Sequence, residues 1–180
     1  MDVAVRISLV AAGIALAAGI ALAAFAHGGR SASSGAAVIK RVVDGDTVVL
    51  TSGARVRLVQ IDTPEVFGST ECYGARASAA TKDLLAPGVR VRLLPEPATD
   101  LVDRYGRLLR YVVRVRDGLD VNVRLVRIGA AAPYFYDGRR GRYAATLDLL
   151  ARRARRLRLG LWGACPRTRY DPDRSVATRS

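Results

Sequence analysis

The chain has 180 residues and a formal net charge of +13, from 29 Lys and Arg against 16 Asp and Glu. Half of its residues are hydrophobic, which excludes a disordered polycation and suffices for a folded core. The one histidine, His27, lies beside an apolar leader, so chemistry that needs a histidine in the folded body is excluded. A zinc site is disfavoured too, because two distant cysteines cannot supply four nitrogen or sulfur ligands.

The N-terminal segment predicts export. Residues 7–26 form an uninterrupted run of small and apolar side chains that ends in Ala24-Phe25-Ala26. Such a run is typical of a signal peptide cleaved after Ala26, and it is also long enough for an uncleaved membrane anchor. Both interpretations of residues 1–26 predict a secreted protein or one anchored on the outer side of the membrane.

Composition divides the rest of the chain into three parts. Residues 27–37 are rich in Gly, Ser and Ala and predict a flexible linker. Residues 38–165 carry the apolar periodicity and predict one folded domain with a modest core. Residues 166–180 are polar and without periodicity, which predicts a disordered tail.

Five runs of the body predict short strands. They lie at residues 38–43, 46–50, 54–61, 89–94 and 108–115. Asp44-Gly45 between the first two runs is a signal for a hairpin turn.

Three further segments predict helices, at residues 74–85, 120–128 and 141–159. Asp120 is the expected N-cap of the second helix, and Gly129 is expected to end it. The last helix has one apolar stripe with a 4-3-4-3 spacing, formed by Tyr143, Leu147, Leu150, Ala154 and Leu157. Five strands with three helices between and after them predict a small β-barrel decorated by helices.

Three acidic clusters stand at the ends of predicted strands. They are Asp44-Gly45-Asp46-Thr47, Asp62-Thr63-Pro64-Glu65 and Asp103-Arg104-Tyr105-Gly106-Arg107. Taken singly, each is consistent with an ordinary turn. Since the body has no histidine, the functional alternative is chemistry carried by carboxylates, arginines and a hard metal ion.

Arg57 lies within a strand that is largely apolar on both faces. Alternation places it on the same side as Val59 and Ile61, so its side chain is predicted to be half-buried. A buried guanidinium needs an anion beside it. A carboxylate at a strand end and the phosphate of a bound ligand both meet that need, and the spacing leaves the two alternatives open.

These segments resemble the three signature blocks of the staphylococcal nuclease (thermonuclease) family. The matching runs are Val43–Thr47, Arg57–Glu65 and Asp103–Leu108, in the family's order. Residues 121–129 and Gly160-Leu161-Trp162 are similar to the family's later segments. The resemblance covers residues 38–165 and implies an α+β fold, a five-stranded OB-fold β-barrel with three α-helices.

The resemblance also implies calcium-dependent cleavage of DNA and RNA. Asp46 and Asp62 would bind Ca²⁺ through their carboxylates and Thr63 through its backbone carbonyl, with Asp44 as a nearby acid outside the ligand set. Carboxylates, carbonyls and waters suit Ca²⁺, which takes about 6–8 oxygen ligands.

The catalytic roles implied by the resemblance fall on two arginines and one acid. Arg57 and Arg107 would hold the scissile phosphate, where a guanidinium can bind two oxygens of the transition state. Glu65 would activate water, directly or through a hydrogen-bond chain, and the usual products carry 3′-phosphates. Three tyrosines are assigned to substrate binding, namely Tyr105, Tyr134 and Tyr136.

The two cysteines, Cys72 and Cys165, are predicted to form a disulfide. In an exported protein an even count favours a bridge, whereas in a cytosolic protein the same residues would be unpaired. The bridge would join the start of the first helix to the end of the last.

The arginine excess has two interpretations. The last predicted helix carries a run of arginines, namely Arg152, Arg153, Arg155, Arg156 and Arg158. This run predicts either a solvated helix face or a surface that attracts nucleic acid.

The sequence favours a monomeric, calcium-dependent, sequence-nonspecific nuclease acting on single-stranded or locally melted DNA and RNA. A non-catalytic OB-fold module that binds nucleic acid or protein is the alternative. A basic protein that binds anionic lipid or wall polymer is a third interpretation, and it rests on charge alone.

Overall fold

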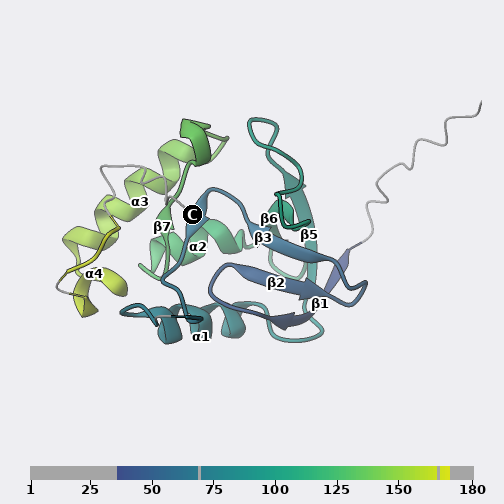
Figure 1. Cartoon of the computed structure of the whole chain (residues 1–180), viewed down its shortest axis with the longest axis horizontal. Coiled ribbons are helices and arrows are strands. Elements are labelled where there is room, and N and C mark those ends of the chain that lie inside the picture. The colour runs from purple at the N-terminus through teal and green to yellow at the C-terminus, as the bar shows by residue number, and fades with distance from the viewer. Residues whose placement is uncertain (1–35, 69, 166, 171–180) are drawn as a thin grey trace, which may run out of the picture. The chain divides into compact units, whose positions relative to one another are not determined.

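The computed structural model describes residues 36–68, 70–165 and 167–170 (Figure 1). The predicted leader at residues 1–26, nearly all of the predicted linker and residues 171–180 of the predicted tail lie outside the described residues. Within these described ranges, no helix combines the length and the hydropathy needed to cross a membrane.

The described domain contains a closed five-stranded barrel, seen at the right in Figure 1. Its strands are β1 (Ala37–Val42), β2 (Thr47–Leu50), β3 (Arg55–Leu58), β5 (Arg90–Pro95) and β6 (Leu108–Arg114). They follow the order β1-β2-β3-β6-β5, and β5 pairs back onto β1. The β3–β6 pair is parallel and the other pairs are antiparallel. This is the strand order of an OB-fold, so the predicted α+β class and the five-stranded barrel are confirmed.

The third predicted strand ends earlier than the sequence indicates. Gln60 has a backbone φ of 65°, which breaks the strand and starts the short β4 (Ile61–Asp62). The Gln60 side chain donates to the carbonyl of Arg139 at 2.7 Å and accepts from the amide of Gly141 at 2.7 Å. β4 then pairs with β7 (Ala132–Pro133) outside the barrel. The break therefore turns the chain after β3 toward the later loops.

Helices cover the barrel on its outside. They are α1 (Gly74–Leu84), α2 (Val121–Arg127), α3 (Ala144–Arg156) and the short α4 (Leu161–Ala164), with a 3₁₀ turn, η1, at Tyr136–Gly138. As predicted, the Asp120 side chain caps α2 by accepting from the amide of Val123 at 3.0 Å. The three predicted helices are present, and α4 is an addition after the third.

The apolar stripe of α3 is shorter than predicted. Leu147 and Ala154 are fully buried, but Leu157 is 56% exposed. The reason is that α3 ends at Arg156, so Leu157 is the C-cap and no longer follows the helical period. Ala151 is buried in addition to the predicted residues.

One continuous core joins the barrel to the three longer helices. Its fully buried members include Ile39, Val48, Leu58, Val91, Val112, Val121, Leu125, Leu147 and Ala151. Asn122 on α2 is the polar tie within this core. Its amide group donates to the Val59 carbonyl at 2.9 Å, and its carbonyl accepts from the Val112 amide at 3.0 Å. Asn122 thereby satisfies backbone groups at the point where β3 ends.

The predicted disulfide between Cys72 and Cys165 is present and connects the loop before α1 with the end of α4. The chain beyond it differs from the predicted disordered tail. Residues 167–170 are described, and Tyr170 is buried against Leu161 and Cys165. The folded domain therefore extends past residue 165, because a buried aromatic ring compensates for ordering the backbone that carries it.

Candidate active site

The turn between β1 and β2 is packed tightly against the end of β4. A Cβ at Gly45 would lie 2.4 Å from the Thr63 hydroxyl, so only glycine fits there. The Gly45 carbonyl accepts from the hydroxyl of Thr81 on α1 at 2.6 Å. These contacts bring the first acidic cluster against the second, although the two lie far apart in the chain.

Asp46 is held at this junction by a dense set of donors. Its Oδ2 accepts from both the amide and the hydroxyl of Thr63, each at 3.0 Å. The Asp44 carboxylate accepts from the Asp46 amide at 3.1 Å. This is the role in an ordinary turn with which the sequence is also consistent. Asp46 and Thr63 are both buried, so their relative orientation is fixed.

Arg57 bridges the two buried aspartates. Its Nη1 lies 2.8 Å from Asp46 Oδ2, and its Nη2 lies 2.9 Å from Asp62 Oδ1. Nη1 also donates to the carbonyls of Leu58 and Ile61, at 3.1 and 3.0 Å. Of the two anions left open by the sequence, the structure shows the carboxylates at the strand ends as its partners.

Burial perturbs the acids around Arg57. It raises the pKa of Asp46 to about 7, and the nearby Asp44 and Asp62 carboxylates add to the effect while Arg57 and Thr63 oppose it. Burial also raises the pKa of Asp62, against the charges of Arg57 and Arg169. One guanidinium thus compensates only in part for the cost of burying two carboxylates.

Glu65 follows this pair on an exposed segment and lines the same pocket. Its backbone amide donates to Glu71 Oε2 at 3.0 Å. Partial burial raises the pKa of the Glu65 carboxyl, with a further contribution from Asp62 and Asp44 and an opposing one from Arg57.

Arg107 is positioned by the third acidic cluster. Its Nε donates to Asp103 Oδ2 at 2.7 Å and its amide donates to Asp103 Oδ1 at 2.9 Å. Its Nη1 reaches the hydroxyl of Thr47 at 3.4 Å, next to Asp46 in the chain. The guanidinium also lies over the Tyr105 ring, 5.4 Å from the centroid. Arg107 is therefore aimed at the barrel end where the first acidic cluster lies.

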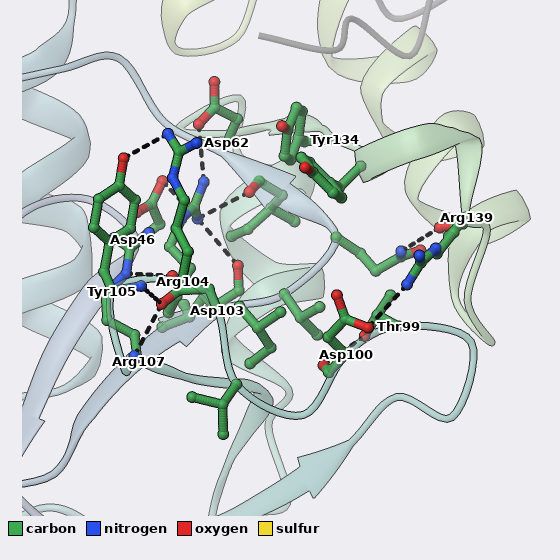
Figure 2. Close-up of a pocket in the computed structure, with 18 of the residues that line it drawn as sticks. Asp46, Asp62, Thr99, Asp100, Asp103, Arg104, Tyr105, Arg107, Tyr134 and Arg139 are labelled. Atoms are coloured by element: carbon green, nitrogen blue, oxygen red, sulfur yellow. Dashed lines mark hydrogen bonds and ion pairs between the residues drawn. The ribbon is translucent and has the colours of Figure 1, made fainter. Parts of the chain in front are cut away.

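A pocket of about 610 Å³ connects these groups. Figure 2 shows Arg104, Tyr105 and Arg107 at one end of it, with Arg139 and Asp100 at the other. Nine of the ten predicted metal, catalytic and substrate-binding residues line it, namely Asp44, Asp46, Arg57, Asp62, Glu65, Tyr105, Arg107, Tyr134 and Tyr136. The tenth, Thr63, lies directly behind Asp46. The two cysteines lie outside the pocket lining, in the disulfide.

The pocket can be tested for its fit to a cation. Over the described ranges, no three His, Cys, Asp or Glu side chains are gathered in a metal-ligating arrangement. Asp62 Oδ2 is nevertheless buried without a hydrogen-bond donor. Asp44, Asp46 and Glu65 add only oxygen donors, and the Thr63 carbonyl can add another. A buried carboxylate oxygen without a donor, among oxygen ligands alone, fits a hard divalent cation such as Ca²⁺.

Much of this chain is similar in sequence to known proteins. Residues 55–164 match the family described as staphylococcal nuclease homologue. The chain belongs to the staphylococcal nuclease family. This is a family of nucleases, so the chain is classed as a hydrolase.

Three relatives show how far the similarity extends. The thermonuclease of Staphylococcus intermedius is 35% identical over 131 residues, which are 69% of this chain and 74% of that protein. The protein ParB of Escherichia coli is 35% identical over 136 residues, 69% of this chain and 70% of that protein. Endonuclease YhcR of Bacillus subtilis (strain 168) is 34% identical over 110 residues, 54% of this chain but only 9% of the relative.

Four residues of the pocket are not predicted from the sequence to belong to it. Gln60 reads as a strand residue, yet its side chain fixes the loop at Arg139 and Gly141. Arg139 in turn pairs with Asp100 at 3.0 Å at one end of the pocket. Arg169 comes from the tail that the sequence predicts to be disordered. The only signal was the polar Gln60 within an apolar run, since the other three lie in loops without periodicity.

Proposed function

We propose that this nuclease hydrolyses phosphodiester bonds of DNA and RNA without sequence specificity, with Ca²⁺ as its cofactor. The observation that carries the proposal is a pocket that brings together Asp46 of the β1–β2 turn, Arg57, Asp62 and Glu65 of the segment from β3 to just after β4, and Arg107 of the turn before β6. Acids for a cation and arginines for a phosphate at one place are the groups that phosphodiester hydrolysis needs.

Asp46 and Asp62 would hold Ca²⁺ through carboxylate oxygens and Thr63 through its carbonyl, with Asp44 close by. The donorless Asp62 Oδ2 and the all-oxygen donor set support this assignment. When bound, the cation would polarise a phosphoryl oxygen and neutralise developing negative charge.

Arg57 and Arg107 would bind the scissile phosphate. Each presents a planar fork of donors that can hold two oxygens at once, and each is already oriented by a carboxylate. Asp62 fixes Arg57, and Asp103 fixes Arg107. Such preorganised donors stabilise the charge that develops in the transition state without reorganising at the moment of reaction.

Glu65 would act as the general base toward water, directly or through a hydrogen-bond chain. The described body has no histidine, and Glu65 is an exposed acid at the pocket wall, three residues after Asp62 in the chain. Attack on the side away from the 5′-oxygen would release that oxygen and leave a 3′-phosphate.

Tyr105, Tyr134 and Tyr136 would contact the nucleotide. Tyr105 and Tyr136 are 61% and 56% exposed, so both can reach a bound nucleotide, and aromatic rings of this kind stack on bases. Stacking requires unpaired bases, so single-stranded or locally melted substrate is preferred. No base-edge specificity follows from such contacts.

The disulfide supports an exported protein, because such bridges persist in oxidising compartments. We propose that residues 1–26 direct this export, as a cleaved signal peptide or as an anchor, and that residues 27–37 form a linker to the nuclease domain. We further propose that the domain acts as a monomer, and that its charge of +13 attracts polyanionic substrate.

The deciding experiment is cleavage of single-stranded DNA by residues 27–180, in Ca²⁺ and in excess chelator, for wild type and Glu65→Gln. Calcium-dependent cleavage that Glu65→Gln greatly slows is the expected result. Binding without turnover in either condition would instead support a non-catalytic OB-fold module. Full cleavage in chelator would contradict the calcium assignment.

A further inference from the structure

A second acid, Glu71, lies behind the candidate base. Its Oε2 accepts from the backbone amide of Glu65 at 3.0 Å, and its own amide donates to the Glu65 carbonyl at 2.9 Å. The two residues thus close the intervening loop by hydrogen bonds in both directions. Gly74, at the start of α1, packs behind this loop, because a Cβ there would lie 2.3 Å from the Glu65 carbonyl oxygen.

The other side of Glu71 is occupied by the C-terminal arm, defined here as residues 167–170. Arg169 Nε lies 2.9 Å from Glu71 Oε1, and Arg169 Nη2 donates to Glu71 Oε2 at 3.2 Å. The Tyr170 hydroxyl donates to the same Oε2 at 3.1 Å. One carboxylate therefore joins the backbone of the candidate base to two side chains of the arm.

The C-terminal arm is anchored where this contact requires it. Tyr170 is 8% exposed and packs against Leu161 and Cys165. Cys165 is bonded to Cys72, which follows Glu71 in the chain. The disulfide thus joins the residue that follows Glu71 to Cys165, which precedes the arm. Arg169 also lies 3.8 Å from Asp62 Oδ2, so the arm reaches the rim of the pocket itself.

We propose that Glu71 is a positioning residue that orients Glu65 for catalysis, and that Arg169 and Tyr170 of the C-terminal arm hold Glu71 in place. The proposal rests on the proposed function, in which Glu65 is the general base. A base on an exposed loop samples many orientations unless its backbone is restrained, and productive proton transfer needs a narrow range of them. Glu71 supplies the restraint without contacting the substrate.

The test uses Glu71→Gln, Arg169→Met and Tyr170→Phe in the whole exported chain, with Arg116→Ala as the control. Arg116 forms an exposed ion pair with Asp117 in the turn after β6, outside the pocket lining. We expect kcat to fall about 10-fold for Glu71→Gln and Arg169→Met, as for outer partners that orient catalytic groups. Tyr170→Phe should show a smaller decrease, and Arg116→Ala should match wild type. KM should stay close to wild type in all four, and kcat is compared at a temperature below the unfolding midpoint of every variant.

A double-mutant cycle separates positioning of Glu65 from a general structural effect. In the Glu65→Gln background, Glu71→Gln should cause no further loss of kcat, because the restrained group no longer transfers a proton. Fully additive losses would overturn the proposal. A rise in KM with unchanged kcat for Arg169→Met would also overturn it, since Arg169 would then bind substrate phosphate instead.

Failure of this inference and failure of the proposed function give different results. If Glu65→Gln is slow and Glu71→Gln cleaves at the wild-type rate, the positioning role alone is wrong. If Glu65→Gln itself cleaves at the wild-type rate, the base assignment is wrong and the positioning role falls with it.

Discussion

Two buried clusters of carboxylates and arginines lie in this domain, and they are built on opposite principles. In the structural cluster, Glu96 at the end of β5 meets Arg142 before α3. In the pocket cluster, Arg57 meets Asp46 and Asp62. The comparison shows which polar burial serves the fold and which serves chemistry.

The structural cluster satisfies its acid completely. Glu96 is 4% exposed and accepts from the amides of Ala98 and Arg142, at 3.1 and 2.8 Å, from the Arg142 guanidinium and from the Tyr111 hydroxyl. Burial alone would raise the pKa of Glu96, but these donors together lower it. Glu96 also fills the space beside Gly141, where a Cβ would lie 2.5 Å from its carboxyl carbon.

The pocket cluster leaves its acids under-compensated. Asp46 and Asp62 share the Arg57 guanidinium, burial raises the pKa of both, and Asp62 Oδ2 has no hydrogen-bond donor, with Arg169 only at 3.8 Å. A buried acceptor without a hydrogen bond costs free energy that the rest of the fold has to offset. The pocket cluster therefore lowers the stability of the fold, whereas the structural cluster contributes to it. Such a difference is expected where a site binds a ligand.

The largest expected effect comes from replacing Asp46 of the pocket cluster. Asp46→Asn removes a proposed Ca²⁺ ligand but keeps the size of the side chain and its contacts with Thr63. Activity should be abolished and calorimetric Ca²⁺ binding weakened, while the unfolding midpoint in chelator stays equal to wild type or rises. Calcium binding as tight as in wild type would show that the cation lies elsewhere.

The next effect concerns the arginine forks. Arg57→Lys and Arg107→Lys keep the charge but lose the second donor to phosphate, so kcat should fall ~100–1000-fold. KM should change much less, because the lost contacts are made mainly in the transition state. Arg142→Lys in the structural cluster is the matched control and should keep kcat within a few-fold. Equal losses of kcat in all three variants would show that the pocket cluster is no more catalytic than the structural cluster.

The structural cluster should respond in stability instead. Glu96→Gln leaves four donors facing a weaker acceptor, and losing hydrogen bonds to a charged group costs about 1.5–3 kcal/mol in unfolding free energy. Urea unfolding measures this loss, and single-stranded DNA cleavage below the transition should remain at the wild-type rate. Loss of activity without loss of stability would place Glu96 in the site and not in the scaffold.

The sequence predicts the two clusters unequally. The pocket cluster can be predicted because its two acids stand at strand ends and its arginine lies inside a strand. These local patterns place Asp46, Arg57 and Asp62 in the same hypothesis. The five barrel strands are readable for the same reason, since alternation and turn residues are local signals. The family resemblance then supplied the roles.

The structural cluster and the C-terminal arm cannot be predicted from the sequence. Glu96 and Arg142 stand 46 residues apart in the chain, and neither the strand pattern before Glu96 nor the helix pattern around Arg142 predicts that they meet. Arg169 and Tyr170 follow a polar, proline-containing stretch that favours disorder by composition. Their order depends on a single buried ring and on contacts with Glu71, and such long-range pairings leave no mark on the local pattern.

The smallest effect is the pH dependence of stability. The folded pKa of Glu96 lies below its ordinary value of about 4.5, so the folded state binds this proton less readily than the unfolded state. Its stabilising contribution is therefore fully present above pH 4.5 and is lost as the pH falls through the folded pKa. The difference in unfolding free energy between wild type and Glu96→Gln should be constant from pH 7 to about pH 5 and should shrink below that.

This pH dependence is measured by urea unfolding of both proteins in chelator, so that no cation contributes. The Asp117→Asn variant is the control, because Asp117 is an exposed acid whose pKa is lowered through its hydrogen bonds with Arg114 and Leu119. Exposure weakens such pairs, so its difference from wild type should stay small at every pH. A difference between wild type and Glu96→Gln that widens toward acid pH would mean that the carboxyl of Glu96 is buried in its protonated form. The two clusters would then be alike in failing to compensate their acids.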